Sequence, residues 1–444
     1  MNTSRRSFIK NSSAALFGAS ALSNLASGEV QDTLPQAGPR NAFGDGPLRI
    51  ALIGCGGRGT GAASQALRTA EMGMGDVKLV AMADAFSDRL DSSHRELTSW
   101  HPDQVDVPEQ RRFTGFDAYK RAMESDVDMV VLATPPGFRP MHFEHAVGLG
   151  KHVFMEKPCA VDAAGVRSVI ATASKADEAG LKVGVGLQRH HQQSYLETIS
   201  RIHDGAIGDL TLLRCYWNSD GVWVRPREAG MSEMTYQMRN WYYFNWLCGD
   251  HITEQHIHNL DVCNWLAGDY PVEAQGQGGR LVRNGLDHGE IFDHHMVEYT
   301  YASGLKMISQ CRHIPGSASS VAEFAHGTNG TANVSGASIK SEGGWSWRFR
   351  GDEENPYQVE HNDLFTAVRS GTAYNEAVNG AKSSMTSILG RMATYSGQIV
   401  RWDDALAADH DLSPAKYDFN AAPPVLPDAE GRYPIAIPGI TPPY

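Results

Sequence analysis

A glycine-rich segment near the start of the chain has the residue types and spacing to bring an anion close to the backbone. An apolar run, Ile50 to Ile53, leads into Gly-Cys-Gly-Gly-Arg-Gly at residues 54–59. In this motif the first glycine permits a tight turn, the second lets the backbone approach a pyrophosphate, and the third lets a following helix pack closely. The helix then offers free backbone amides to the anion. The residues predicted to bind a dinucleotide cofactor here are Gly54, Gly56, Gly57, Arg58 and Gly59.

An acidic residue follows the second apolar run. Asp84 ends that run, 25 positions after the last glycine of the motif, where a carboxylate accepts hydrogen bonds from ribose hydroxyls. Its charge repels a 2′-phosphate, so the pattern favours NAD over NADP. Arg89, five residues further on, is predicted to be a solvated helix residue. Thr134 and Pro135 end the next apolar run, at the strand edge where a nicotinamide would lie.

Alternating strands and helices are needed to position these residues. Apolar runs that predict strands alternate with stretches of helical character, and this order implies parallel strands joined by helical crossovers. The predicted strands are 48–53, 77–83, 129–133, 152–155 and 182–186, and the predicted helices are 61–71, 87–99, 118–125 and 163–179. The fold class is therefore α/β, with a doubly wound parallel sheet of Rossmann type.

The pattern changes after about residue 209. Strand-like segments are now separated mostly by turns, at 210–216, 272–280, 294–301 and 305–311. A helical insert is predicted over 241–267, and two late helices over 361–370 and 385–400. This arrangement predicts a second, α+β domain with an open, mainly antiparallel sheet. The last 24 residues hold seven prolines, which predicts an extended tail.

The first 28 residues carry the pattern of an export signal. Arg5 and Arg6 form a twin-arginine pair, an apolar stretch rich in Ala and Ser follows, and small residues at 26–28 suit a signal peptidase. The twin-arginine translocase moves proteins that are already folded, which favours a tightly held cofactor. We therefore expect a periplasmic protein that uses this translocase as a partner.

Composition and charge exclude several classes of protein. The chain has 444 residues and a formal net charge of −12, which argues against a nucleic-acid partner. No apolar stretch reaches the roughly 18 residues of a membrane span. Six scattered cysteines lack metal-site spacing, so buried thiols are expected, with pairing left open. The predicted parts are a signal peptide at 1–28, a linker at 29–47, a Rossmann domain at 48–188, a substrate-binding and oligomerisation domain at 189–400 and a proline-rich tail at 401–444.

Further motifs match one known family. Residues 133–136 read Ala-Thr-Pro-Pro, residues 150–153 read Gly-Lys-His-Val, and residues 156–158 read Glu-Lys-Pro. With the glycine motif, these segments make the chain resemble the Gfo/Idh/MocA family over most of residues 48–400. The resemblance implies a Rossmann domain and a second domain whose open sheet often mediates dimers or tetramers. It also implies a place in the cofactor site for His142, Glu156 and Lys157.

The same resemblance assigns the reacting groups. It implies that Lys157 binds a sugar hydroxyl beside the nicotinamide, and that Pro158 fixes the local turn, with a cis bond as one means. The family's second motif is Asp-x-x-x-His, and this chain has Glu254 in the Asp position and His258 four residues later. That spacing predicts one helical face for both, where a histidine beside a carboxylate suits general-base catalysis. Because Glu is longer than Asp, the substrate geometry is expected to differ.

Three more residues are predicted to bind the substrate. Arg189 and His190 follow the fifth strand at the domain junction. Trp241 lies, with Trp217, Trp223 and Trp246, in the segments expected to line the cleft, where aromatic rings stack on sugar C–H faces. For His190, a hydrogen bond between the two domains is an equal alternative.

Neighbouring histidines raise the question of a metal site. His256 and His258 are two residues apart and point to different faces of a helix, so they are not expected to chelate one ion. The adjacent pairs His190-His191 and His294-His295 are the other candidates considered. We expect no metal site.

Two enzyme hypotheses share this set of residues. The first is an NAD(P)-dependent oxidoreductase that acts on a sugar or polyol hydroxyl, keeps its cofactor tightly bound and forms a homo-oligomer. The alternative is an NAD-dependent glycosidase that oxidises a ring hydroxyl, eliminates the glycosidic substituent, adds water and reduces the ketone back, with no net redox change. A cofactor-binding protein without catalysis is disfavoured, because Lys157, Glu254 and His258 occur together.

Overall fold

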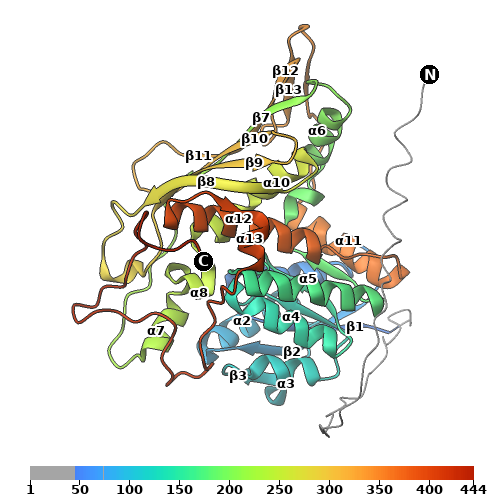
Figure 1. The fold of residues 1–444 in the computed structure, drawn as a ribbon. Coiled ribbons are helices and arrows are strands. Elements are labelled where there is room, and N and C mark those ends of the chain that lie inside the picture. Colours follow the sequence, from blue (N-terminus) through green and yellow to red (C-terminus); the bar gives the residue numbers. More distant parts are fainter. Residues whose placement is uncertain (1–45, 74) are drawn as a thin grey trace, which may run out of the picture. The chain divides into compact units, whose positions relative to one another are not determined.

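The computed structural model describes residues 46–73 and 75–444 (Figure 1). The predicted signal peptide at 1–28 and the linker up to residue 45 lie outside these residues. Within the described part of the chain, no helix is both long enough and apolar enough to cross a membrane. All six cysteines lie in the described part, and each is a buried free thiol, as expected.

The N-terminal half contains a six-stranded sheet in which every pairing is parallel. Its strand order is β3-β2-β1-β4-β5-β6. Successive strands are added toward one edge of the sheet from β1 to β3 and toward the other edge from β4 to β6, and this change between β1 and β4 creates a switch point for ligand binding. This is the doubly wound Rossmann sheet predicted from the sequence. The strands are β1 (Leu48–Ile53), β2 (Val77–Asp84), β3 (Arg112–Thr114), β4 (Met129–Leu132), β5 (His152–Met155) and β6 (Val183–Val185).

Helices cover both faces of this sheet, which is why its central strands read as continuous apolar runs. Ala51 and Ile53 point to the core shared with α3, α4 and α5, while Ile50 and Leu52 point to the core shared with α1, α2 and α11. Helix α11 comes from the second half of the chain and covers the first sheet, a crossing that the sequence pattern does not indicate. The helices are α1 (Gly57–Arg68), α2 (Ser87–Trp100), α3 (Ala118–Glu124), α4 (Arg139–Gly148), α5 (Ala163–Glu178) and α11 (Pro356–Ser370).

The second sheet has nine strands in the order β14-β13-β12-β11-β7-β10-β9-β8-β15. All its pairings are antiparallel except β10 with β7, so the mainly antiparallel sheet is confirmed. Burial alternates along β9 and β10, and the buried face packs on α10 and α12 (Figure 1). The elements are β7 (Leu210–Ser219), β8 (Pro271–Gly279), β9 (His294–Tyr301), β10 (Lys306–His313), β11 (Ser320–Gly327), β12 (Gly330–Asn333), β13 (Ser338–Ser341), β14 (Ser346–Arg348), β15 (Val400–Arg401), α6 (Gln193–His203), α10 (Ile257–Ala267) and α12 (Ala377–Ser396).

The helical insert predicted over 241–267 is broken into short pieces, which corrects the sequence interpretation. Gly249 and Asp250 both have positive φ, +74° and +71°, so the helix stops and restarts there. A second break at residues 255–256 places Glu254 and His258 on successive helices rather than on one helical face. The pieces are η5 (Trp241–Tyr243), α8 (Asn245–Cys248) and α9 (His251–Glu254), followed by α10; a separate helix, α7 (Glu233–Arg239), precedes them.

The C-terminal tail begins with α13 (Trp402–Ala407) and then has no helix or strand. It is held along both halves of the chain by backbone contacts. The Leu412 amide donates to Asp162, and the Phe419 carbonyl accepts from Ser232. The tail therefore runs extended over other elements. The remaining short helical turns are η2 (Glu109–Arg111), η3 (Pro136–Phe138), η4 (Gln188–His191) and η6 (Leu286–His288).

Candidate active site

The glycine loop between β1 and α1 has the geometry that a pyrophosphate requires. Gly54 has φ +96°, and a Cβ there would lie 2.5 Å from the Thr134 backbone nitrogen. A Cβ on Gly59 would lie 1.9 Å from the Gly54 carbonyl oxygen, so only glycine lets α1 pack this close. A Cβ on Gly56 or Gly57 would meet nothing within 4 Å, which leaves open space beside the first amides of α1. The loop therefore fits a dinucleotide pyrophosphate at a helix N-terminus.

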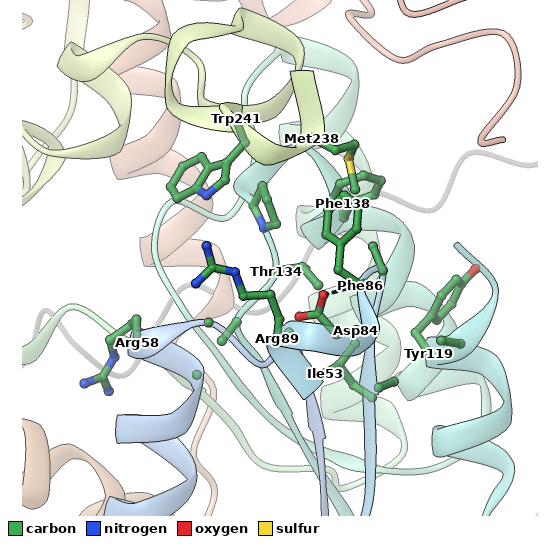
Figure 2. Close-up of a pocket in the computed structure, with 18 of the residues that line it drawn as sticks. Ile53, Arg58, Asp84, Phe86, Arg89, Tyr119, Thr134, Phe138, Met238 and Trp241 are labelled. Atoms are coloured by element: carbon green, nitrogen blue, oxygen red, sulfur yellow. Dashed lines mark hydrogen bonds between the residues drawn. The ribbon is translucent and has the colours of Figure 1, made fainter. Parts of the chain in front are cut away.

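A cavity of about 520 Å³ adjoins this loop at the carboxyl ends of β1, β2 and β4 (Figure 2). Asp84 lies on its wall, and its two carboxylate oxygens accept hydrogen bonds from the amides of Cys55 (2.7 Å) and Phe86 (2.9 Å). Burial raises the pKa of this carboxyl, and the two amide donors oppose the shift. Each oxygen keeps a lone pair for a ribose hydroxyl. The carboxylate is thus oriented for the role predicted for it.

Three residues predicted from the β4 end also line the cavity: Thr134, Pro135 and His142. The Thr134 hydroxyl lies 3.2 Å from His142 Nδ1. Burial, with the nearby Arg139 charge, lowers the pKa of His142 to about 3, so this imidazole is neutral. A neutral His142 fixes the Thr134 hydroxyl at the strand edge without adding charge beside a nicotinamide.

The second half of the chain supplies one wall of the cavity, and Trp223 and Trp241, both in segments expected from the sequence to line the cleft, lie on it. Arg225, Met238 and Arg239 line it as well. These three lie about 165–180 residues from the glycine motif in sequence and carry no motif of their own, so only the fold brings them in.

Arg89 also lines the cavity, which corrects the expectation of a solvated helix residue. Figure 2 shows its side chain between Asp84 and Trp241. Its proximity to Asp84 in the sequence was the one available signal. The wall therefore offers a guanidinium as well as a carboxylate to the bound nucleotide.

Arg58 and Glu156 interact with each other rather than meeting in the cavity. The Arg58 guanidinium forms an ion pair with Glu156 and lies 3.6 Å from the buried Glu360. Arg58 lines the cavity, but in Figure 2 its side chain points away from Asp84; Glu156 is not among the lining residues. The pair ties α1 to the end of β5 and to α11, and a direct contact of Glu156 with the cofactor stays a prediction.

The structure brings Lys157 and Glu254 together across the two halves of the chain. Lys157 Nζ donates to the Glu254 backbone oxygen at 2.6 Å and to its Oε1 at 3.0 Å. The two side chains are only 12% and 11% exposed. Burial raises the pKa of Glu254, and the Lys157 ammonium opposes that shift. The peptide bond between Lys157 and Pro158 is cis.

His258 is a buried, neutral imidazole near this pair. Burial lowers its pKa well below the ordinary value, and the positive charges of Lys157, Arg189 and Arg58 lower it further. Its ring stacks on Trp217 at 6.1 Å between centroids, and Nδ1 has no hydrogen-bond partner among the described residues. A neutral imidazole keeps one unprotonated ring nitrogen that can accept a proton, as a general base must, while its lowered pKa makes this imidazole a weak base.

Arg189 and His190 are engaged by the second half of the chain. Arg189 forms an ion pair with Glu323 on β11, and His190 Nε2 lies 2.7 Å from Asp261 on α10. The His190 ring also stacks on Trp265. Both partners of His190 lie with it in the predicted 189–400 domain, so its contacts do not join the two predicted domains. Substrate binding by either side chain stays a prediction.

Comparisons with known proteins agree with this geometry. A model described as "Oxidoreductase family, NAD-binding Rossmann fold" matches residues 48–186, and one described as "GFO/IDH/MocA C-terminal domain" matches residues 195–353. The chain is 25% identical over 261 residues to an inositol 2-dehydrogenase of Rhizobium meliloti, covering 59% of this chain and 67% of the relative. It is 27% identical over 225 residues to one of Klebsiella pneumoniae, covering 50% and 55%.

The chain thus spans between about half and two thirds of the length of these relatives. Among solved structures, an aldose-aldose oxidoreductase from Caulobacter crescentus is similar in fold. Its TM-score is 0.62 at 19% identity, over 80% of this chain and 100% of that one.

Proposed function

Because the chain belongs to the Gfo/Idh/MocA family of NAD-binding oxidoreductases, we propose that it oxidises a secondary hydroxyl of a polyol or sugar and keeps its cofactor bound between turnovers. The observation that carries this proposal is the Lys157–Glu254 ion pair with a neutral His258 nearby, at the end of the dinucleotide-binding sheet. When bound there, a nicotinamide accepts a hydride from the carbon that bears the hydroxyl.

The chain's own residues would manage the hydroxyl proton. The Lys157 ammonium donates a hydrogen bond to the substrate oxygen, and Glu254 holds that ammonium in place. The imidazole of His258 takes the proton, since at neutral pH it is unprotonated and Nδ1 has no competing donor among the described residues. As the C–H bond breaks, loss of the hydroxyl proton prevents positive charge from building up on the carbonyl product.

The walls of the cavity support retention of the cofactor. Arg239 forms two hydrogen bonds of 2.7 Å with Asp88 on α2, so the segment that holds Trp241 is tied across the cleft to the Rossmann half. In the tail, the Phe419 ring packs 5.6 Å from Phe86 and 4.7 Å from Phe116, measured between centroids. Both of these phenylalanines line the cavity. A nucleotide in this cleft leaves only after such contacts open.

A polyol or sugar substrate is favoured by the aromatic wall and by the relatives. Trp223 and Trp241 lie edge to face at 5.7 Å on the cavity wall, where apolar C–H faces of a ring can stack. The curated relatives named above are inositol 2-dehydrogenases. Net oxidation is therefore preferred over the glycosidase cycle. For the cofactor, Asp84 favours NAD over NADP, because a carboxylate repels a 2′-phosphate.

One experiment tests the proposal in two steps. Purified protein is denatured, and the released ligand is identified by mass; we expect close to one equivalent of NAD or NADH. Native protein is then given inositols and aldoses, and nicotinamide absorbance is followed in single turnovers without added cofactor. Hydride transfer to the bound cofactor supports the proposal. Release of no nucleotide, or hydrolysis of an aryl glycoside with no substrate-induced absorbance change, contradicts it.

We also propose that the protein is exported through the twin-arginine pathway to the periplasm, supported by Arg5 and Arg6. Changing both residues to Lys should retain the protein in the cytoplasm, as measured by cell fractionation. Equal periplasmic amounts of the variant and the parent protein would contradict this.

The open face of the second sheet supports a homodimer or homotetramer. Sedimentation equilibrium measures the mass directly, and a monomer at micromolar concentration would contradict that part.

A further inference from the structure

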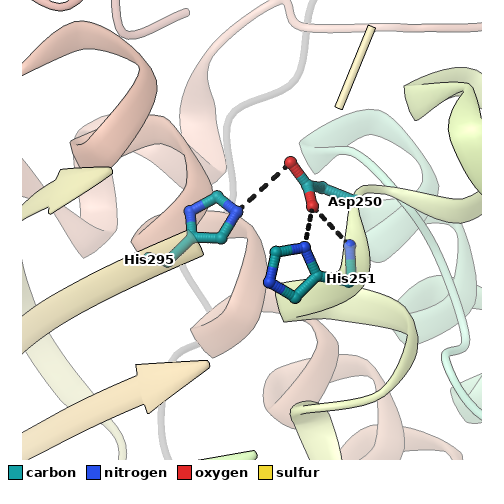
Figure 3. Close-up of side chains that lie close together, drawn as sticks. All are labelled: Asp250, His251 and His295. Atoms are coloured by element: carbon teal, nitrogen blue, oxygen red, sulfur yellow. Dashed lines mark hydrogen bonds and ion pairs between the residues drawn. The ribbon is translucent and has the colours of Figure 1, made fainter. Parts of the chain in front are cut away.

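A cluster of three potential metal ligands lies outside the site described above. Asp250 precedes α9, His251 is the first residue of that helix, and His295 comes from β9 (Figure 3). All three are buried, with His295 the most exposed at 3%. One ligand atom from each lies within 4.8 Å of the others. The nearest nitrogens of His251 and His295 are 2.7 Å and 3.2 Å from the two Asp250 oxygens.

Each imidazole directs one ring nitrogen toward a different oxygen of the carboxylate. Both nitrogens of His251, and Nε2 of His295, have no hydrogen-bond partner among the described residues. Other histidine–aspartate pairs in the same structure differ, because His190 and His294 make well-directed hydrogen bonds of 2.7 Å to their carboxylates. Buried ring nitrogens without partners are rare in folded proteins. Here they surround a single carboxylate.

The surrounding residues hold the cluster as they would hold the ligands of a metal. His295 Nδ1 lies 2.8 Å from the Thr394 hydroxyl, which leaves Nε2 as the nitrogen facing Asp250. Asp250 Oδ2 accepts hydrogen bonds from the Tyr395 hydroxyl at 2.6 Å and from the Phe292 amide at 3.0 Å. Such outer contacts fix the tautomer and orientation of metal ligands.

No lysine or arginine forms an ion pair with Asp250 within residues 46–73 and 75–444. We propose that Asp250, His251 and His295 bind a divalent transition-metal ion such as Zn²⁺. Two imidazoles and one carboxylate suit zinc or iron(II), and ligands about 2.1 Å from a tetrahedral ion lie roughly 3.4 Å apart. His251 Nδ1 and His295 Nε2 lie 2.7 Å and 3.2 Å from different oxygens of Asp250, so binding requires the His251 separation to open by about 0.7 Å and the widest separation, at most 4.8 Å, to contract.

The ion would have a positioning role. It would join the start of α9 to β9, and α9 ends at Glu254, whose carboxylate holds the Lys157 ammonium. Asp250 sits at φ +71° and ψ 162°, a conformation that side-chain-bearing residues rarely adopt and that surrounding contacts must maintain. A metal–carboxylate bond supplies such a contact. The sequence did not indicate this site, because its ligands come from different elements and His294-His295 contributes only one ring.

The test uses the tag-free full chain, treated with a chelator, dialysed against micromolar ZnCl₂ and then against buffer. After the second dialysis we expect about one zinc per chain by elemental analysis. With free zinc held at 100 times Kd, we expect a Tm about 3 °C above that of the chelated protein. In His295→Gln both effects should be lost. The matched control is His294→Gln, at the adjacent position on β9, where the ring pairs with Asp293 and is 40% exposed; it should keep both effects.

Three outcomes would overturn the proposal. They are less than a tenth of an equivalent of zinc in the parent protein, equal zinc in parent and His295→Gln, which indicates adventitious metal only, or equal loss in both variants. If His295→Gln does not fold, X-ray absorption of the zinc-loaded parent protein decides. Two imidazole nitrogens at about 2.0–2.1 Å support the site, and a shell without imidazole refutes it.

Discussion

Replacing Lys157 by Met should reveal how strongly the buried ion pair with Glu254 stabilises the protein. The variant leaves a carboxylate that is 11% exposed, whose Oε2 already lacks a hydrogen-bond partner. Removing one member of a buried pair typically costs about 3–5 kcal/mol, because the other charge stays desolvated. Unfolding about 400 residues has an entropy of about 0.84 kcal/mol/K, at about 2.1 cal/mol/K per residue. The expected fall in Tm is therefore about 4–6 °C.

The fall should depend on pH in a defined direction. Without the ammonium, burial holds the folded-state pKa of Glu254 even further above its unfolded value of about 4.3. Below the unfolded pKa the carboxyl is protonated in both states, and it does not destabilise the fold. As pH rises from there through the folded pKa, ionisation favours the unfolded chain. The difference in Tm between variant and parent should thus be larger at pH 8 than at pH 5.

Calorimetry of four proteins tests this reasoning. The matched control is Lys175→Met, which removes an exposed partner 3.5 Å from Glu144 and should lower Tm by about 1 °C or less. The double variant Lys157→Met/Glu254→Gln removes both charges and should recover most of the lost Tm without recovering activity. Equal Tm values for Lys157→Met and Lys175→Met, or a double variant no more stable than Lys157→Met, would refute the argument that the pair is desolvated.

Four further outcomes are expected. Gly54→Ala places a Cβ 2.5 Å from the Thr134 nitrogen, so purified protein should release little nucleotide on denaturation; a full equivalent would contradict the role of the loop. His258→Asn should lower kcat by about 10²–10⁴-fold with Tm nearly unchanged, and activity near that of the parent would remove it as the base. Burial and Lys157 hold the pKa of His258 well below its ordinary value, so the imidazole stays unprotonated down to pH 6. The profile of kcat/KM should therefore show no acid limb between pH 8 and 6, and a fall centred near pH 6.5 would refute the neutral imidazole. Phe419→Ala removes a ring that packs beneath the cavity wall, so bound nucleotide should dissociate faster in a competition assay, and an unchanged rate would separate the tail from cofactor retention.

The parts of the fold that could be predicted are those in which one chemical requirement dominates a short segment. Strands β1 and β5 have the predicted bounds, because a strand buried on both faces must be apolar throughout. Helix α4 was missed, since it contains a buried Arg139 that donates to the Leu132 carbonyl and so lacks an apolar pattern. Strands β11 to β14 were missed as well, because β12 to β14 have only three or four residues each and β11 has few buried positions, so none shows a clear apolar pattern.

The residues of the candidate site also fall into those that the sequence predicts and those that it does not. Gly54 and Asp84 follow from local spacing, because the turn and the strand end that they occupy are local structures. Arg225 and Arg239 could not be found, since their position depends on how the second half of the chain crosses the first. The helix breaks in this segment were also hidden: one depends on positive φ at Gly249 and Asp250, and the other falls at residues 255–256, before His258, and 3.6-residue periodicity reveals neither.

The tail that packs against the wall of the cofactor cleft also sets an order of events during synthesis. Asp84 leaves the ribosome about 335 residues before Phe419, an interval of roughly 20–70 s at about 5–20 residues per second. During that interval the glycine loop is already translated, while the aromatic contacts beneath the cleft do not yet exist. A nucleotide that enters then meets a cleft whose wall the tail does not yet support, and completion of the chain adds that support. Refolding of the full-length chain offers no such interval, so cofactor uptake should be more efficient during translation than after it.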